Sequence, residues 1–266
     1  MIEILQYPFF QRALMAAVLL GFSLPLIGVF VVTRRLSFFG EAVAHSAFAG
    51  LALSALLALP ALPTVIGFAI VIAVAIFLTL HRTEIPSDTV IGVYLAFCAG
   101  AGILLLGILQ GYQPSLFQFL FGDILALAWE DVWLVLAMCA GSVLAMLAMW
   151  NPLLRVSVHR EMAMAMGTPA ARVDLLFLIL LAVMVTLSLK LIGIVLVTAM
   201  LLLPAAAARN FARSFRGMAI TACLIGGISS VLGLYASYWF GTASGAAIVL
   251  TAAVVFLLSV MLRRAK

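Results

Sequence analysis

Charged residues are scarce in this chain of 266 residues. Only 9% of the residues are Asp, Glu, Lys or Arg, whereas a soluble domain carries roughly 25%. Hydrophobic residues make up 67%, the mean hydropathy is +1.34, and apolar runs extend along the whole length. The composition therefore predicts an all-α integral membrane protein with a single transmembrane domain over 1–266, and leaves no room for an additional soluble domain.

Several motifs of soluble chemistry are missing as well. The three cysteines stand singly in apolar runs without a CxxC pair, which argues against a tight structural zinc site. No GxxxxGK[ST] loop is present to cradle nucleotide phosphates. An HExxH element and an obvious nucleophile–base pair are also missing, so an intramembrane enzyme lacks support and we expect no enzymatic activity in this chain.

What the chain has instead is a series of apolar segments. A span needs about 20 apolar residues to cross about 30 Å of hydrocarbon. The sixth and seventh of nine candidates are short and share a hinge at Gly193, so eight spans remain an alternative to nine. The candidates are 9–33, 37–59, 61–80, 89–109, 132–150, 175–191, 193–208, 217–240 and 244–262.

The positions of Lys and Arg predict the orientation of these spans. Cations accumulate in cytoplasmic loops, and nine spans that begin outside put 12 of the 14 cations inside. Only Arg12 and Lys190 then fall outside. Membrane topology thus explains the excess of Lys and Arg over Asp and Glu, and we expect no nucleic-acid partner.

The stretch RRLSFFGEAVAHSAFAG, residues 34–50, places two ionisable groups in the second span. Glu41 and His45 are one helical turn apart and share a face. Counting a continuous helix from Arg35 places Glu41 about 9 Å and His45 about 15 Å deep, where such a residue normally faces a cavity or a partner. Carboxylate and imidazole groups suit a divalent transition metal, whereas a polar pair satisfied by helix packing is the alternative interpretation.

Two connections are more than turns. Residues 110–131 are too long and apolar for a simple outer loop, and we expect a re-entrant or interfacial segment there. Within the inner loop 151–174, residues 161–166 predict a short helix, with Gly167 as its stop and Pro169 beyond. A short cytoplasmic helix of this kind can lie on the membrane or dock into a partner.

Small residues recur inside the spans. Gly21, Gly28, Gly226, Gly227 and Gly233 are candidates either for gating points or for close helix packing, and we favour packing.

Four blocks of sequence, the stretch at 34–50 among them, resemble the membrane subunits of bacterial ABC importers for zinc and manganese. RRLSFFGEAVAHSAFAGLAL matches a basic pair followed by G-[DE]-x-x-x-H. LFGDILALAWEDV at 120–132 and KLIGIVLVTAMLLLPAAAARNFARS at 190–214 agree in order and spacing, and SGAAIVLTAAVVFLLSVMLRR at the C-terminal end also fits. The resemblance covers nearly the whole chain and is closest to the zinc-uptake branch, mainly through LFGDILALAWED.

The resemblance implies an ABC importer permease in the bacterial inner membrane. Its partners would be a second copy of the chain, cytoplasmic ATP-binding subunits and an extracytoplasmic solute-binding protein. No permanent cofactor is implied, and the expected cargo is a divalent metal, namely zinc.

The same resemblance assigns roles to particular residues. Glu41 and His45 match the metal contacts, with Glu41 where Asp is common. Ser237 and Gly241 stand where many relatives carry a further ligand. The loop HREMAMAMGTPAARVD matches the coupling helix that fits the ATPase, and its candidate coupling residues are His159, Arg160, Glu161, Met164, Met166 and Gly167.

Two other functions remain open. Carboxylate plus imidazole suits manganese and iron as well as zinc. An ion-gradient metal carrier would need no ATPase, although such carriers often show repeated halves, and no convincing repeat is present.

Overall fold

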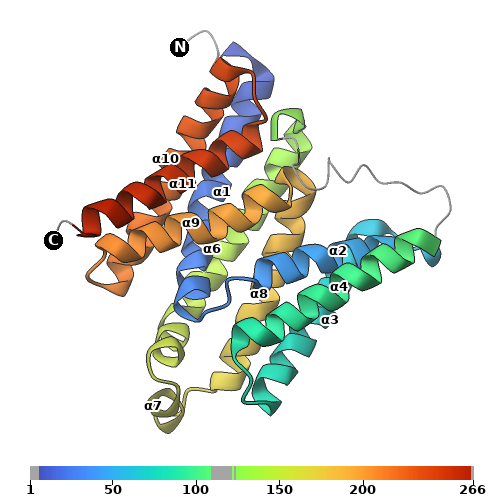
Figure 1. Cartoon of the computed structure of the whole chain (residues 1–266), viewed down its shortest axis with the longest axis vertical. Helices are drawn as coiled ribbons and strands as arrows, with labels where there is room; N and C mark the ends of the chain where they lie inside the picture. Colours follow the sequence, from blue (N-terminus) through green and yellow to red (C-terminus); the bar gives the residue numbers. More distant parts are fainter. Residues whose placement is uncertain (1–5, 109–121, 123, 265–266) are drawn as a thin grey trace. The chain divides into compact units, whose positions relative to one another are not determined.

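The computed structural model describes residues 6–108, 122 and 124–264, and in that part of the chain all regular structure is helical (Figure 1). Nine of the described helices are long and apolar enough to cross a membrane, which confirms the nine-span prediction over eight. The predicted re-entrant segment lies largely outside the described residues. The helices are α1 Pro8–Thr33, α2 Phe39–Leu56, α3 Ala61–Arg82, α4 Ser87–Ile108, η2 Ile124–Ala126, α6 Trp129–Val158, α7 Arg160–Ala165, α8 Ala170–Ile192, α9 Ile194–Phe211, α10 Phe215–Phe240 and α11 Ser244–Arg264.

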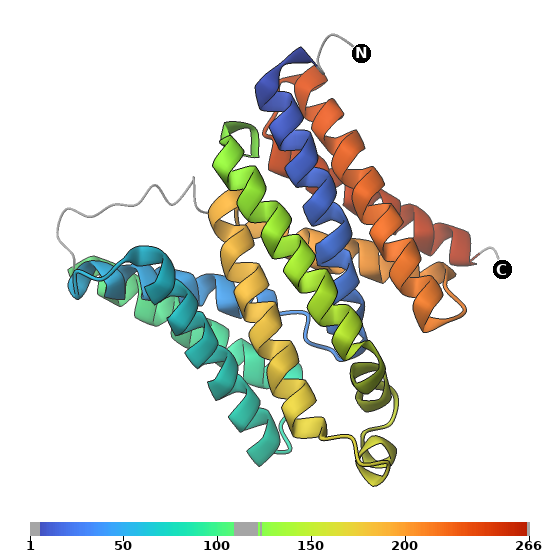
Figure 2. The ribbon, with the colours of Figure 1, turned by 180° about the vertical axis from the view of Figure 1, so that it is seen from behind.

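The chain forms two compact units, and helices α6 and α8 each have residues in both of them. One unit comprises Met1–Val32, Phe117–Leu144 and Ser188–Lys266, and the other comprises Thr33–Leu116 and Ala145–Leu187. In the second unit α2 packs against α3 and α4, as both views of the ribbon show (Figures 1 and 2). This packing leaves little space: a Cβ added to Gly102 of α4 would lie 3.1 Å from the Cβ of Phe48.

In the first unit α9, α10 and α11 pack against one another. Helix α1 joins them through glycine contacts. A Cβ on Gly28 would lie 1.8 Å from the carbonyl oxygen of Leu201, and one on Gly226 would lie 2.1 Å from that of Gly21. At these distances only glycine fits, which supports the packing interpretation for Gly21, Gly28 and Gly226.

The second span begins later than the sequence predicts. Arg34 and Arg35 lie in a turn, and α2 starts at Phe39. The structure therefore lacks the continuous helix from Arg35 along which the depth was counted. Measured from the start of α2, Glu41 lies in the first turn and His45 lies about 9 Å along the axis, at 1.5 Å per residue.

Helix α6 is longer than predicted. It runs for 30 residues through Pro152 to Val158, so the expected inner loop starts as helix. At 1.5 Å per residue α6 is about 45 Å long, against about 30 Å for the hydrocarbon core.

Candidate functional site

Between Phe39 and Gly50, helix α2 is buried except along one stripe. Glu41, His45 and Phe48, at spacings of four and three residues, are partly exposed, while Ala42, Val43, Ala44, Ser46 and Ala47 between them are buried. That spacing is one face of a helix. The structure therefore brings the two predicted metal contacts together on the one face of this stretch that the chain leaves open.

The His45 ring is oriented by its own helix. Its Nδ1 lies 3.0 Å from the carbonyl oxygen of Glu41. Because a carbonyl oxygen can only accept, Nδ1 is the donor in this bond, and in the neutral ring Nε2 then holds the lone pair that a metal can bind. Metal-binding histidines typically hold the other ring nitrogen in this way. The bond alone does not mark a metal site, since His81 makes the same contact with Phe77.

Glu41 gains from its position as well. It lies in the first turn of α2, where the positive end of the helix dipole favours a carboxylate. An ionised Glu41 is the form that a metal cation binds.

A third ligand is missing from this chain as far as the structure describes it. Across residues 6–108, 122 and 124–264, no group of three His, Cys, Asp or Glu side chains lies close enough to hold a metal ion. Ser237 and Gly241 serve to end α10 instead: Gly241 adopts φ 60°, and the Ser237 hydroxyl donates to the carbonyl of Thr242 at 2.6 Å. A complete coordination sphere therefore needs donors from elsewhere.

The predicted short inner helix is present as α7, one residue earlier than expected. His159 is its N-cap, and Arg160 and Glu161 form its first turn. Gly167 ends it at φ 80°, where its N–H donates to Met164 (2.9 Å) and that of Thr168 donates to Ala163 (2.9 Å). This pair of bonds is the Schellman arrangement, which confirms Gly167 as the stop.

The surface of α7 is apolar and open. Ala163 is buried, whereas Met162, Met164 and Met166 are exposed. A shallow apolar groove lies between α7 and the end of α6. It is lined by Leu154, Arg155, Val158, His159, Met162, Ala163 and Met166. Flexible methionine side chains on an exposed helix suit a protein partner.

A charge cluster beside α7 was not singled out from the sequence. The carboxylate of Asp174 pairs with Arg34 and Arg160, and His81 lies next to them. Asp174 and Arg34 are 140 residues apart in the sequence, so no local sequence pattern predicts that they pair. The signal available was one acidic residue at the start of an apolar span.

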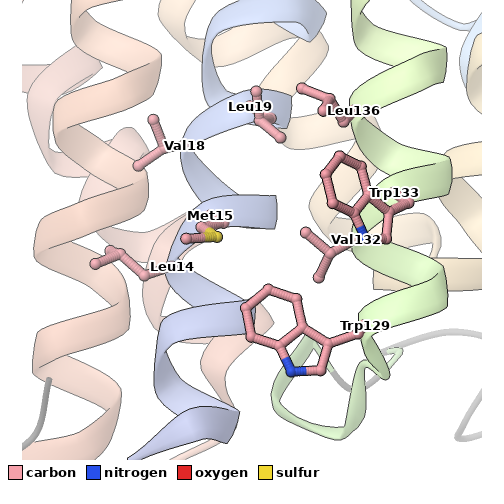
Figure 3. Close-up of a pocket in the computed structure, with 8 residues that line it drawn as sticks. All are labelled: Leu14, Met15, Val18, Leu19, Trp129, Val132, Trp133 and Leu136. Atoms are coloured by element: carbon pink, nitrogen blue, oxygen red, sulfur yellow. The ribbon is translucent and has the colours of Figure 1, made fainter. Parts of the chain in front are cut away.

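A second groove lies between α1 and the first half of α6 (Figure 3). The rings of Trp129 and Trp133 extend from α6 toward α1, where Met15 and Leu19 line the other wall. Its lining side chains hold no carboxylate, imidazole or thiol, so it is not a metal site.

Residues 6–263 match the family described as the ABC 3 transport family. The chain belongs to the ABC 3 transport family. It is 32% identical to the manganese import system permease protein ScaB of Streptococcus parasanguinis, over 96% of this chain and 90% of that one. It is 30% identical to the high-affinity zinc uptake system membrane protein ZnuB of Haemophilus influenzae, over 94% and 96%.

A solved structure agrees with this membership. PsaBC from Streptococcus pneumoniae in complex with Fab matches 97% of this chain and 93% of its own, with a TM-score of 0.83 and 34% identity. As an ABC 3 family member, the chain is a multi-pass permease of a metal importer in the bacterial inner membrane. Manganese and zinc permeases resemble it about equally, so the predicted closeness to the zinc branch is not confirmed.

Proposed function

We propose that this ABC 3 permease carries zinc into the cell. Zinc would arrive from an extracytoplasmic binding protein, pass Glu41 and His45, and be driven inward by an ATPase docked on α7. The observation that carries the proposal is the open stripe of α2, where a carboxylate and an imidazole with a free Nε2 lie one turn apart.

The imidazole of His45 is the reason to propose zinc first, although the pair can also bind manganese or iron. Zinc binds imidazole nitrogen and carboxylate oxygen readily, whereas manganese is better suited by carboxylate, carbonyl and water oxygens. Two protein ligands hold an ion loosely, and a transported ion must leave as easily as it enters.

A second copy of the chain would supply the missing ligands. A twofold axis repeats the same patch on both subunits, so two copies of Glu41 and His45 at the axis would offer four donors. The stripe is partly exposed in the single chain, as such a shared site requires.

Manganese is the second candidate cargo. The relative ScaB is named as a manganese permease, and its identity to this chain is as high as that of the zinc permease ZnuB. Membership of an ABC family meanwhile favours an ATP-driven importer over the ion-gradient carrier.

A competition experiment separates the two metals. The full complex of permease, ATPase and binding protein is placed in lipid vesicles with ATP, and uptake of radioactive zinc is measured against increasing unlabelled manganese, and the reverse. We expect zinc to suppress manganese uptake at a lower concentration than manganese suppresses zinc uptake. The opposite order would favour manganese, and uptake that persists without ATP would contradict the importer itself.

A further inference from the structure

Asp174 is the most deeply buried charged side chain beside the inner helix. It lies near the start of α8 and is 3% exposed. A buried carboxylate is costly unless it is paired and hydrogen-bonded. The groups around it come from three other parts of the second unit, and together they form the Asp174 cluster: Arg34, His81, Arg160 and Asp174.

The two oxygens of Asp174 bind different segments. Oδ1 accepts from Nη2 of Arg34, in the turn before α2. Oδ2 accepts from Nη1 of Arg160, the first residue of α7, at 2.6 Å. The carboxylate therefore bridges α7 to the segment that leads into α2.

His81 closes the cluster from α3. Its Nδ1 donates to the carbonyl of Phe77 at 3.0 Å, so its Nε2 accepts from Nη2 of Arg160 at 2.7 Å. The same Nε2 lies 3.6 Å from Oδ2 of Asp174. Arg160 is thus held by two groups, one on α8 and one on α3.

Of the two arginines that bind Asp174, Arg34 is the more buried and Arg160 the more exposed. The Arg34 side chain is 14% exposed, and its guanidinium carbon lies 5.4 Å from the ring centre of the buried Phe177. The Arg160 side chain is 43% exposed, about three times as much as that of Arg34. A displacement of α7 would therefore change the Arg160–Asp174 contact before the Arg34–Asp174 contact.

A buried ion pair of this kind is not needed for stability alone. Apolar residues of similar volume often stabilise a fold equally well. What the charges provide is a directional connection between segments far apart in sequence. Arg34 lies five residues before α2, the helix that carries Glu41 and His45.

We propose that Asp174 is the positioning residue that links α7 to α2 through Arg160 and Arg34. Movement imposed on α7 by the ATPase reaches the metal-facing helix by this route. The inference rests on the proposed transport function and adds to it a mechanical connection inside the permease.

The test measures coupling rather than activity alone. In vesicles holding the full complex with its binding protein, metal uptake and ATP hydrolysis are measured together, and their ratio is compared between variants. In Arg160→Gln and Arg34→Gln we expect the ratio to fall at least about tenfold, within the range typical of coupling between sites. Arg34→Gln is the sharper variant, because Arg34 lies outside the inner loop and bonds to Asp174.

Two further variants serve as controls. Arg160→Lys keeps a cation beside Asp174 and should restore most of the ratio. Arg172→Gln removes an exposed cation near the start of α8, outside the cluster, and should match the wild type.

The outcomes separate this inference from the transport function. A wild-type ratio in both Gln variants would overturn the link. Parallel loss of hydrolysis and uptake at an unchanged ratio would also overturn it, because it would indicate a role in assembly only. Failure of the wild-type complex to carry any divalent metal would instead contradict the proposed function.

Discussion

Glu41 and His45 differ in what their own helix supplies. The Nδ1 of His45 donates to a carbonyl of its own helix, while Glu41 lies at the end of the helix dipole that favours a carboxylate. The sequence predicted their shared face because periodicity depends only on local spacing. It did not predict where α2 begins, since that depends on the turn at Arg34 and Arg35.

Gly28 tests the packing at the scale of one residue. A methyl group there would lie 1.8 Å from the carbonyl of Leu201, and backbone cannot move aside cheaply. We expect Gly28→Ala to destabilise the permease by roughly 1–3 kcal/mol, as for other overpacked sites. The measurement is thermal unfolding of the purified protein in detergent.

Gly67→Ala is the matched control. Gly67 lies inside α3 with nothing within 4 Å of an added Cβ, so the change should be neutral or stabilising by about 0.5–1 kcal/mol. Equal melting temperatures for the two variants would contradict the packing interpretation.

At the scale of the helices, the termini followed from local chemistry where a capping residue was present. Gly167 stops α7 as predicted, because only a left-handed residue completes its last turn. Helix α6 ends later than predicted, because the helix continues through Pro152 to Val158. The Asp174 cluster was beyond prediction, because its partners meet only when the spans pack.

The exposed face of α7 predicts the effect of charge on docking. Met164→Asp together with Met166→Asp places two carboxylates on an apolar surface. We expect the double variant to lose most of its ATPase on co-purification, while it still inserts in the membrane. Ala171→Asp, also exposed but in the first turn of α8, should retain the ATPase. Full retention by the double variant would rule out α7 as the docking helix.

At the scale of the whole molecule, nine spans and the distribution of cations predict that α7 lies in the cytoplasm. The test is a single Cys in a chain whose Cys98, Cys139 and Cys223 are replaced by Ala. Ser157→Cys, near the end of α6, should resist a thiol reagent that cannot cross the inner membrane. The reagent is added to cells whose outer membrane has been made permeable to it. Thr242→Cys, in the turn between α10 and α11, should react readily. The reverse pattern would invert the topology.

The central claim is that metal passes Glu41 and His45. The most direct measurement is radioactive zinc uptake by vesicles that hold the full complex, at matched permease content. We predict that His45→Ala and Glu41→Gln each lower uptake at least about tenfold, as loss of a metal contact should. Glu41→Asp, which keeps the carboxylate, should retain uptake. Wild-type rates in both His45→Ala and Glu41→Gln would contradict the account and leave the pair as polar groups satisfied by helix packing.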